Sequence, residues 1–205
     1  MTTPTLLPSL PPEGVLGSAR ARPSLPEGLA GLVVRTLERF RRHCPAFDDF
    51  NWHIEMLTWQ WTRFAGLSGD DVYDMLALRS TSFVVEQDCV YLDPDGLDRQ
   101  SWHLLGRGAG GELLAYVRVC DPGVKYAPPS IGRVVVAPSQ RGTGLGHVLI
   151  AEALKRCDAT WPGEPNRIGA QAHLQGFYGR HGYVPVGETY LEDGIVHIDM
   201  ERAAS

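Results

Sequence analysis

The chain lacks the features that mark several classes of protein. None of its apolar runs approaches the roughly 18 residues of a membrane span, and its first residues lack the basic-then-apolar pattern of a secretory signal. Its net charge is −5 over 205 residues, so it lacks the positive excess that is typical of nucleic-acid binding. These absences predict a cytoplasmic protein that binds neither membranes nor nucleic acids.

Cysteine is also scarce and dispersed. The four cysteines include no pair with the spacing of metal ligands, which predicts reduced thiols and no metal site. The remaining composition is that of an ordinary globular protein, with 43% hydrophobic and 21% charged residues. The acidic balance favours a cationic substrate.

Prolines crowd the first 26 residues, and apolar residues over 27–43 fall near helical spacing. We therefore expect residues 1–50 to form a flexible tail with a possible helix, and residues 51–205 to form the folded domain. Strands are predicted at 56–64, 101–106, 112–120, 131–136, 167–173, 183–191 and 195–200, and helices at 71–87, 144–157 and 174–181.

These elements predict an α/β (α+β) domain with a central sheet of about seven strands and flanking helices. The β-branched run 131–136 is predicted as a central strand. Asp70 is the expected N-cap of helix 71–87. The pair Asp193-Gly194 is a hairpin turn signal between the last two strands.

A glycine-rich turn is the most informative feature of the chain. Residues 131–147 read IGRVVVAPSQRGTGLGH, an apolar strand followed by a turn and the start of a helix. A helix N-terminus presents free N–H groups, and Gly142, Gly144 and Gly146 leave that backbone open to a ligand. Arg141 adds a cation. The turn therefore predicts a phosphate or pyrophosphate site, although a turn that needs glycine only for its geometry would look the same.

Two other phosphate motifs do not fit this turn. A Walker A loop requires Gly-Lys-Ser/Thr, and no lysine follows any of the three glycines. A dinucleotide fingerprint requires Gly-x-Gly-x-x-Gly, but counting from Gly142 the last position is His147.

The predicted helix 71–87 carries two charged residues, Arg79 and Glu86, on an otherwise apolar face. Either both pair with other groups at the rim of the core, or both lie beside a substrate pocket. The acidic segment 93–98 is interpreted as a solvated turn or as a loop that attracts an ammonium substrate. The face of the helix comprises Val72, Met75, Leu76, Arg79, Phe83 and Glu86.

Taken together, these stretches resemble the GNAT superfamily of N-acetyltransferases, and within it the ElaA-type subgroup. The superfamily motif Arg/Gln-x-x-Gly-x-Gly/Ala corresponds to residues 141–146 here. The subgroup resemblance rests on residues 76–98, 131–138 and 169–198, and it extends over about residues 56–202. It implies a GNAT-like mixed, largely antiparallel sheet, and an N-acetyltransferase that moves the acetyl group of acetyl-CoA to a primary amine in a ternary complex.

The resemblance also implies the cofactor site. The strands 131–137 and 167–173 would splay apart, so that strand backbone pairs with the pantetheine arm while the turn holds the pyrophosphate. The implied cofactor-binding residues are Val134, Val135, Val136, Arg141, Gly142, Thr143, Gly144, Leu145 and Gly146.

Acetyl transfer to an amine requires a neutral amine, a polarised carbonyl and a protonated leaving thiolate. The resemblance implies Tyr178 as the acid, although a Phe-Tyr pair on a short helix is often only core. Glu86 is our first choice of base, with Asp95 and His103 left open. A backbone N–H of residues 134–136 is the natural donor to the carbonyl.

The residues that would bind the acceptor amine are harder to identify from the sequence. Gln171 and His173 alternate on the predicted strand 167–173 and so share a face, although His173 could equally be structural. The predicted acceptor is a small-molecule or peptide amine, and a homodimer is possible. A non-catalytic acyl-CoA sensor and a transferase for longer acyl chains remain alternatives. The proposed substrate-binding residues are Arg79, Phe83, Gln171, His173 and Tyr190.

Overall fold

The computed structural model describes residues 57–204. The expectations for residues 1–50 lie outside these described residues. Among residues 57–204, no helix is both long enough and apolar enough to cross a membrane.

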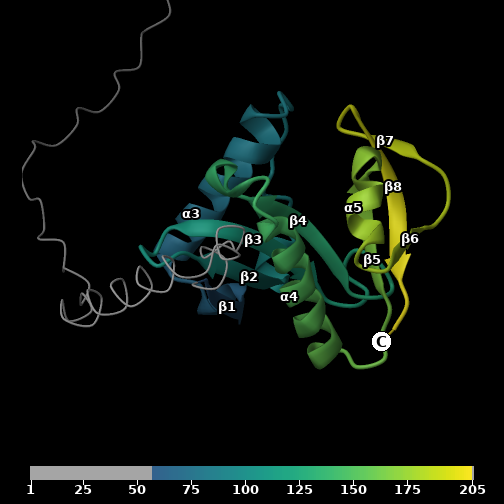
Figure 1. Ribbon diagram of the computed structural model, residues 1–205, viewed down its shortest axis with the longest axis horizontal. Coiled ribbons are helices and arrows are strands. Elements are labelled where there is room, and N and C mark those ends of the chain that lie inside the picture. Colours follow the sequence, from purple (N-terminus) through teal and green to yellow (C-terminus); the bar gives the residue numbers. More distant parts are fainter. Residues whose placement is uncertain (1–56, 205) are drawn as a thin grey trace, which may run out of the picture. The chain divides into compact units, whose positions relative to one another are not determined.

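Within the described part of the chain, eight strands form two four-stranded sheets in which every pairing is antiparallel (Figure 1). The first sheet has the order β1–β2–β3–β4, and in the second sheet β8 pairs with β5, β6 and β7. The mixed α+β architecture is confirmed. The strands are β1 (Thr58–Arg63), β2 (Trp102–Arg107), β3 (Leu113–Cys120), β4 (Ser130–Val136), β5 (Asn166–Gln171), β6 (Tyr183–Pro185), β7 (Tyr190–Glu192) and β8 (Ile195–Arg202).

The expectation that residues 131–136 form a central strand is wrong. Among the described strands β4 pairs only with β3, so it is an edge strand of its sheet. A β-branched run reports burial of the two faces of a strand, not pairing along its two edges, so the pattern could not distinguish the two positions. The expected single sheet is accordingly divided in two beside β4.

The helices are α3 (Gly69–Arg79), α4 (Leu145–Thr160) and α5 (Gln175–Gly179). Ser68, not Asp70, is the N-cap of α3, because Ser68 and Asp71 form a reciprocal capping box that satisfies two N–H groups. The predicted helix 71–87 is also not uniform. It becomes a π-helix over Ser80–Val85, where the Glu86 N–H donates to the Thr81 carbonyl at 3.0 Å.

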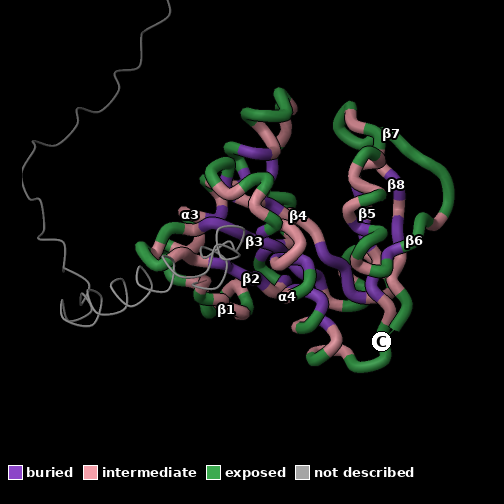
Figure 2. Tube along the Cα trace, viewed as in Figure 1, coloured by how far each residue is buried: buried purple, intermediate pink, exposed green. Residues whose placement is uncertain are grey.

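Alternate side chains along the strands of the first sheet pack into two different core clusters. Leu104 and Val117 pack with α4 in one cluster, whereas Leu105 and Tyr116 pack with Met75 of α3 in the other. β2 and β3 are therefore buried along their length, and the α4 core continues into the second sheet (Figure 2). This packing holds β4 and β5 at the junction of the two sheets.

β4 and β5 meet near their first residues and then diverge. The Arg167 N–H donates to the Pro129 carbonyl at 3.2 Å, but beyond this contact the two strands belong to different sheets. The expected splaying of these strands is confirmed. The turn at Asp193-Gly194 is also confirmed, because both residues adopt positive φ between β7 and β8. The predicted strand 183–191, however, is divided into β6 and β7.

Candidate active site

The diverging strands border a cleft of about 590 Å³. Residues 131–134 of β4 line one wall and residues 168–171 of β5 line the other. Each strand is an edge on this side, so alternate backbone N–H and C=O groups along it are left without ladder partners. Such a cleft can hold an extended ligand that carries amide groups by strand-like hydrogen bonds.

The glycine turn after β4 has the open geometry that its sequence predicts. Gly142 and Gly144 adopt φ of 76° and 89°, and Gly144 is the N-cap of α4. A Cβ atom at either glycine would meet nothing within 4 Å. Among the described residues, no group accepts a hydrogen bond from the N–H groups of Gly142, Gly144 or Gly146. The turn therefore fits a phosphate group at the N-terminus of α4.

Thr143 and Leu145 stabilise the conformation of the turn by contacts inside it. The Thr143 Oγ1 donates to the Gln140 carbonyl at 2.7 Å and accepts from the Leu145 N–H at 3.4 Å. The Leu145 side chain is buried in the core beside α4, so only its backbone belongs to the turn surface.

Arg141 lies across from the π-helix. Its guanidinium donates to the Glu86 carboxylate at 2.6 Å and to the Ser82 hydroxyl at 3.1 Å. Arg141, Glu86 and residues 134–136 line a second cavity of about 390 Å³. Phe83, Gln87 and Val134 line both cavities, so the two spaces share a wall.

Tyr178 of α5 lines the cleft although its side chain is largely buried, with 8% of the residue exposed. It packs edge-on against Phe177 and Tyr183. Burial raises the pKa of Tyr178 to about 12, so the phenol stays protonated at neutral pH. The structure thus provides a protonated hydroxyl at the cleft.

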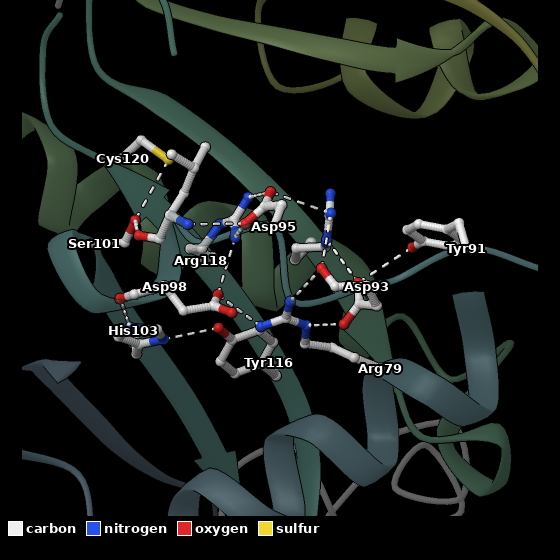
Figure 3. Close-up of polar contacts among 12 residues, drawn as sticks. Arg79, Tyr91, Asp93, Asp95, Asp98, Ser101, His103, Tyr116, Arg118 and Cys120 are labelled. Carbon is white, nitrogen blue, oxygen red and sulfur yellow. Dashed lines mark hydrogen bonds and ion pairs between the residues drawn. The ribbon is translucent and has the colours of Figure 1, made fainter. Parts of the chain in front are cut away.

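Arg79 does not line the cleft, so its position does not fit the proposed substrate-binding role. Its side chain is fully buried, and its Nε and Nη1 donate to Asp93 at 2.7 Å and to Asp98 at 2.8 Å (Figure 3). Of the two interpretations of the helix face, the paired one therefore describes Arg79. The sequence could not reveal the pairing, because the partners lie 14 and 19 residues away.

The acidic segment 93–98 is only partly solvated, because Pro94, Asp95 and Gly96 are exposed but the two flanking aspartates are not, which corrects that expectation. Asp93 and Asp98 are buried, and Asp95 receives two hydrogen bonds from Arg118, at 2.6 and 2.7 Å. Burial acts to raise the pKa of Asp95, but the hydrogen bonds and charge of Arg118 outweigh burial and lower that pKa. A carboxylate with a lowered pKa is a weak base, which disfavours Asp95 in that role.

The surroundings of His103 also do not suit a catalytic base. It is fully buried, and its ring nitrogens contact the Tyr116 hydroxyl at 2.8 Å and the Asp98 carbonyl at 2.9 Å. Burial lowers the pKa of His103. The ring therefore belongs to the buried polar network (Figure 3).

The remaining acceptor candidates divide into two groups. Phe83 and Gln171 line the cleft, and the Gln171 side chain donates to Gln87 at 3.3 Å. His173 does not alternate with Gln171 on a strand, because β5 ends at Gln171 and His173 lies in a 3-10 turn. Tyr190 lies on β7, with its hydroxyl committed to Asp199 at 3.0 Å.

Sequence reasoning missed the segment that follows the π-helix. Gln87, Cys89, Tyr91 and Leu92 all line the cleft. The Cys89 thiol also donates to the Asp193 carbonyl at 3.4 Å, which links this segment to the β7–β8 hairpin. The run of Ser, Thr and Val residues over 80–85, which favours helix weakly, was the available signal that the helix changes there.

Comparisons with known proteins agree with this geometry. The family model described as Acetyltransferase (GNAT) domain matches residues 96–204. Protein ElaA of Escherichia coli is 44% identical over 149 residues, which cover 72% of this chain and 97% of that protein. Its crystal structure aligns with a TM-score of 0.67, covering 72% of this chain and 99% of ElaA.

A second solved structure is similar to the same degree. The acyl-CoA N-acyltransferase from Pseudomonas aeruginosa is 46% identical, with a TM-score of 0.69 and coverage of 72% of this chain and 99% of that chain. The chain belongs to the GNAT acetyltransferase family and to its ElaA-like group.

Proposed function

We propose that the protein is an N-acetyltransferase that transfers the acetyl group of acetyl-CoA to a primary amine by direct attack in a ternary complex. The observation that carries this proposal is the cleft between β4 and β5, which is lined by a protonated tyrosine and whose strand β4 leads into an open glycine turn. Similarity to the Pseudomonas aeruginosa acyl-CoA N-acyltransferase supports transfer of an acyl group to nitrogen.

The two parts of the site suit two parts of the donor. Backbone groups of Val134, Val135 and Val136 lie at an unpaired strand edge and would pair with the pantetheine arm. The N–H groups of residues 142–146 would hold the pyrophosphate at the start of α4, where the helix dipole favours negative charge. Arg141 would pair with the same phosphates, in competition with Glu86.

The chemistry requires one proton to be given and one to be removed. Acetyl-CoA, when bound, supplies an acetyl group activated as a thioester. Tyr178 lies at the cleft with a raised pKa, so it holds the proton that a leaving thiolate needs. The Val134 N–H is the proposed donor to the thioester carbonyl, where negative charge develops.

Glu86 is the proposed base for the attacking amine, acting through water. It is exposed and lines the cavity that shares a wall with the cleft. Phe83 and Gln171, which line the cleft, are the proposed acceptor contacts. Tyr190 and His173 are proposed as further contacts of the acceptor, although neither lines the cleft. The proposed acceptor is a small-molecule or peptide amine.

Thermal unfolding with and without acetyl-CoA tests the proposed site directly. At about 100 times its dissociation constant, acetyl-CoA should stabilise the protein by roughly 2.7 kcal/mol, which corresponds to several degrees. The Gly144→Glu variant should lose this shift, because its side chain adds bulk and negative charge where the pyrophosphate would bind.

A matched control separates this effect from backbone strain. Gly163 has a φ of 80° and open surroundings like Gly144, but it lies beyond the other end of α4. Gly163→Glu should therefore keep the acetyl-CoA shift. A wild-type protein that shows no shift at millimolar acetyl-CoA would refute the site, and a shift from acyl-CoA with no transfer to any amine would favour a sensor.

A further inference from the structure

β4 carries a strained bulge in the wall of the cleft. Tyr116 and Arg118 of β3 oppose Val135 and Gly132 of β4, so two steps along β3 match three steps along β4. Within the bulge, Arg133 adopts a φ of 52°. This left-handed conformation is unfavourable for a residue with a Cβ atom and persists only where the surroundings hold it.

The side chain of Arg133 provides such a hold. Its Nε donates to the Asp93 carboxylate at 2.8 Å, and its Nη2 reaches the Asp93 carbonyl at 3.2 Å and Asp95 at 3.3 Å. Arg133 is thus tied to the loop between α3 and β2 by both side-chain and backbone acceptors. Asp93 lies 40 residues before Arg133 in the chain, so this tie fixes two distant segments against each other.

Asp93 is itself fixed from the opposite side. Its second carboxylate oxygen accepts from the Arg79 Nε at 2.7 Å, and both side chains are buried. Arg79 also binds Asp98, which in turn accepts from Arg118 at 2.9 Å (Figure 3). Because Asp93 has a cation on each oxygen and is buried, it cannot move without breaking a charge-assisted pair. It forms a rigid anchor for Arg133.

The bulge lies immediately before the proposed carbonyl donor. Arg133 and Val134 both line the cleft, and they are the β4 residues without register partners on β3. A bulge leaves its extra residue unpaired and turns the neighbouring peptide groups out of the ladder. The direction of the Val134 N–H therefore depends on the conformation of Arg133.

We propose that Arg133 is a positioning residue for acyl transfer: its ion pair with the buried Asp93 holds the β4 bulge so that the Val134 N–H points at the thioester carbonyl. This inference rests on the proposed function. Arg133 acts through the backbone and touches neither the acyl group nor the amine.

Two substitutions at Arg133 separate the backbone role from a side-chain role. Arg133→Ala removes the anchor but keeps the Cβ atom, so the bulge should relax. Arg133→Gly also removes the anchor, but glycine tolerates positive φ and should retain part of the bulge. In the unliganded full-length protein, the Val134 amide resonance should move furthest in the Ala variant and less in the Gly variant.

The same order is expected with acetyl-CoA labelled with ¹³C at the carbonyl carbon. The carbonyl resonance of the bound thioester should shift toward its position in water in the Ala variant and less so in the Gly variant. With any amine that the wild type acetylates, Arg133→Ala should lower kcat by roughly 10- to 100-fold, because an oxyanion donor is misaligned. The Kd of acetyl-CoA should change little.

Equal effects of the Ala and Gly variants, with unchanged Val134 and carbonyl resonances, would overturn the proposal. If Arg133→Ala does not fold, Arg133→Lys tests the same point, because one ammonium cannot reproduce the three contacts of the guanidinium. Wild-type binding is measured first. Absence of acetyl-CoA binding refutes the proposed function, whereas the unliganded Val134 resonance tests the bulge independently.

Discussion

At the scale of single residues, Tyr178 combines two properties that seldom occur together. It is nearly buried, and it still lines the cleft between the two sheets. Burial disfavours the phenolate, which keeps the proton on the oxygen throughout the neutral range. Such a residue still carries the proton that a leaving thiolate must receive.

We expect Tyr178→Phe to lower kcat by about 100-fold, because it removes a general acid. The Kd of acetyl-CoA should stay within a factor of about three, because only the hydroxyl is lost. Steady-state rates with an accepted amine, together with calorimetric binding, measure the two effects. Between pH 7 and 10, the wild-type rate should show no decline from ionisation of Tyr178, because its pKa is about 12.

Tyr183→Phe is the matched control for this prediction. The Tyr183 hydroxyl donates to Asn166 at 2.5 Å within the core. Its loss should reduce the stability of the protein without a comparable effect on kcat. Full activity in Tyr178→Phe at saturating acetyl-CoA would exclude the acid role.

At the scale of elements, the second sheet needs close approach at Gly169 of β5. The hydroxyls of Tyr126 and Tyr190 both donate to Asp199 of β8, at 2.8 and 3.0 Å. A Cβ atom at position 169 would lie 2.8 Å from the Tyr190 oxygen and 3.0 Å from the Tyr126 oxygen. Glycine is therefore what allows β7 and the β3–β4 loop to meet over β5.

Gly169→Ala should destabilise the protein by about 1–3 kcal/mol, because the added methyl group displaces both hydroxyls from Asp199. Urea unfolding measures the change in the free energy of unfolding. Gly176→Ala is the control, since a Cβ atom there meets nothing within 4 Å and α5 accepts alanine. That variant should be neutral or more stable by about 0.5 kcal/mol. Equal stabilities of the two variants would contradict the close approach.

At the scale of the whole molecule, buried charge pairs make stability depend on pH in one direction. The pKa values of Asp95 and Asp98 are lowered, because hydrogen bonds and charges of the arginines outweigh the opposing effect of burial. Burial also lowers the pKa of His103. In each case the unfolded chain binds more protons than the folded chain at acidic pH, so acid favours unfolding.

We therefore expect the free energy of unfolding to decrease as pH falls below about 6.5, the ordinary pKa of histidine. The decrease should steepen below about 4, where unfolded carboxylates take up protons. Urea unfolding at a series of pH values measures the slope. Asp95→Asn should make the acidic part of the slope shallower, and greater stability at pH 3 than at pH 5 would contradict this account.

Local sequence patterns were sufficient to predict those features of the structure that neighbouring residues determine. The open turn at Gly142 and Gly144 follows from glycine itself, and the Asp193-Gly194 hairpin follows from the positive φ that this pair tolerates. The order of strands and helices follows from periodicity. The N-cap at Ser68 also has a local signal, because the spacing Ser-x-x-Asp resembles a capping box, although the prediction placed the N-cap at Asp70.

The family, the order of the elements and the glycine turn can be read from the sequence, because these depend on neighbouring residues. The partners of its charges depend on the folded structure. Arg79, Asp93 and Arg133 lie on three separate segments. Only folding brings the carboxylate of Asp93 to 2.7 Å from the Arg79 guanidinium and to 2.8 Å from that of Arg133. The folded structure also decided that β4 is an edge strand with a bulge, since pairing depends on which distant strand lies alongside. A linear pattern reports which residues prefer burial, but long-range contacts determine which groups meet there.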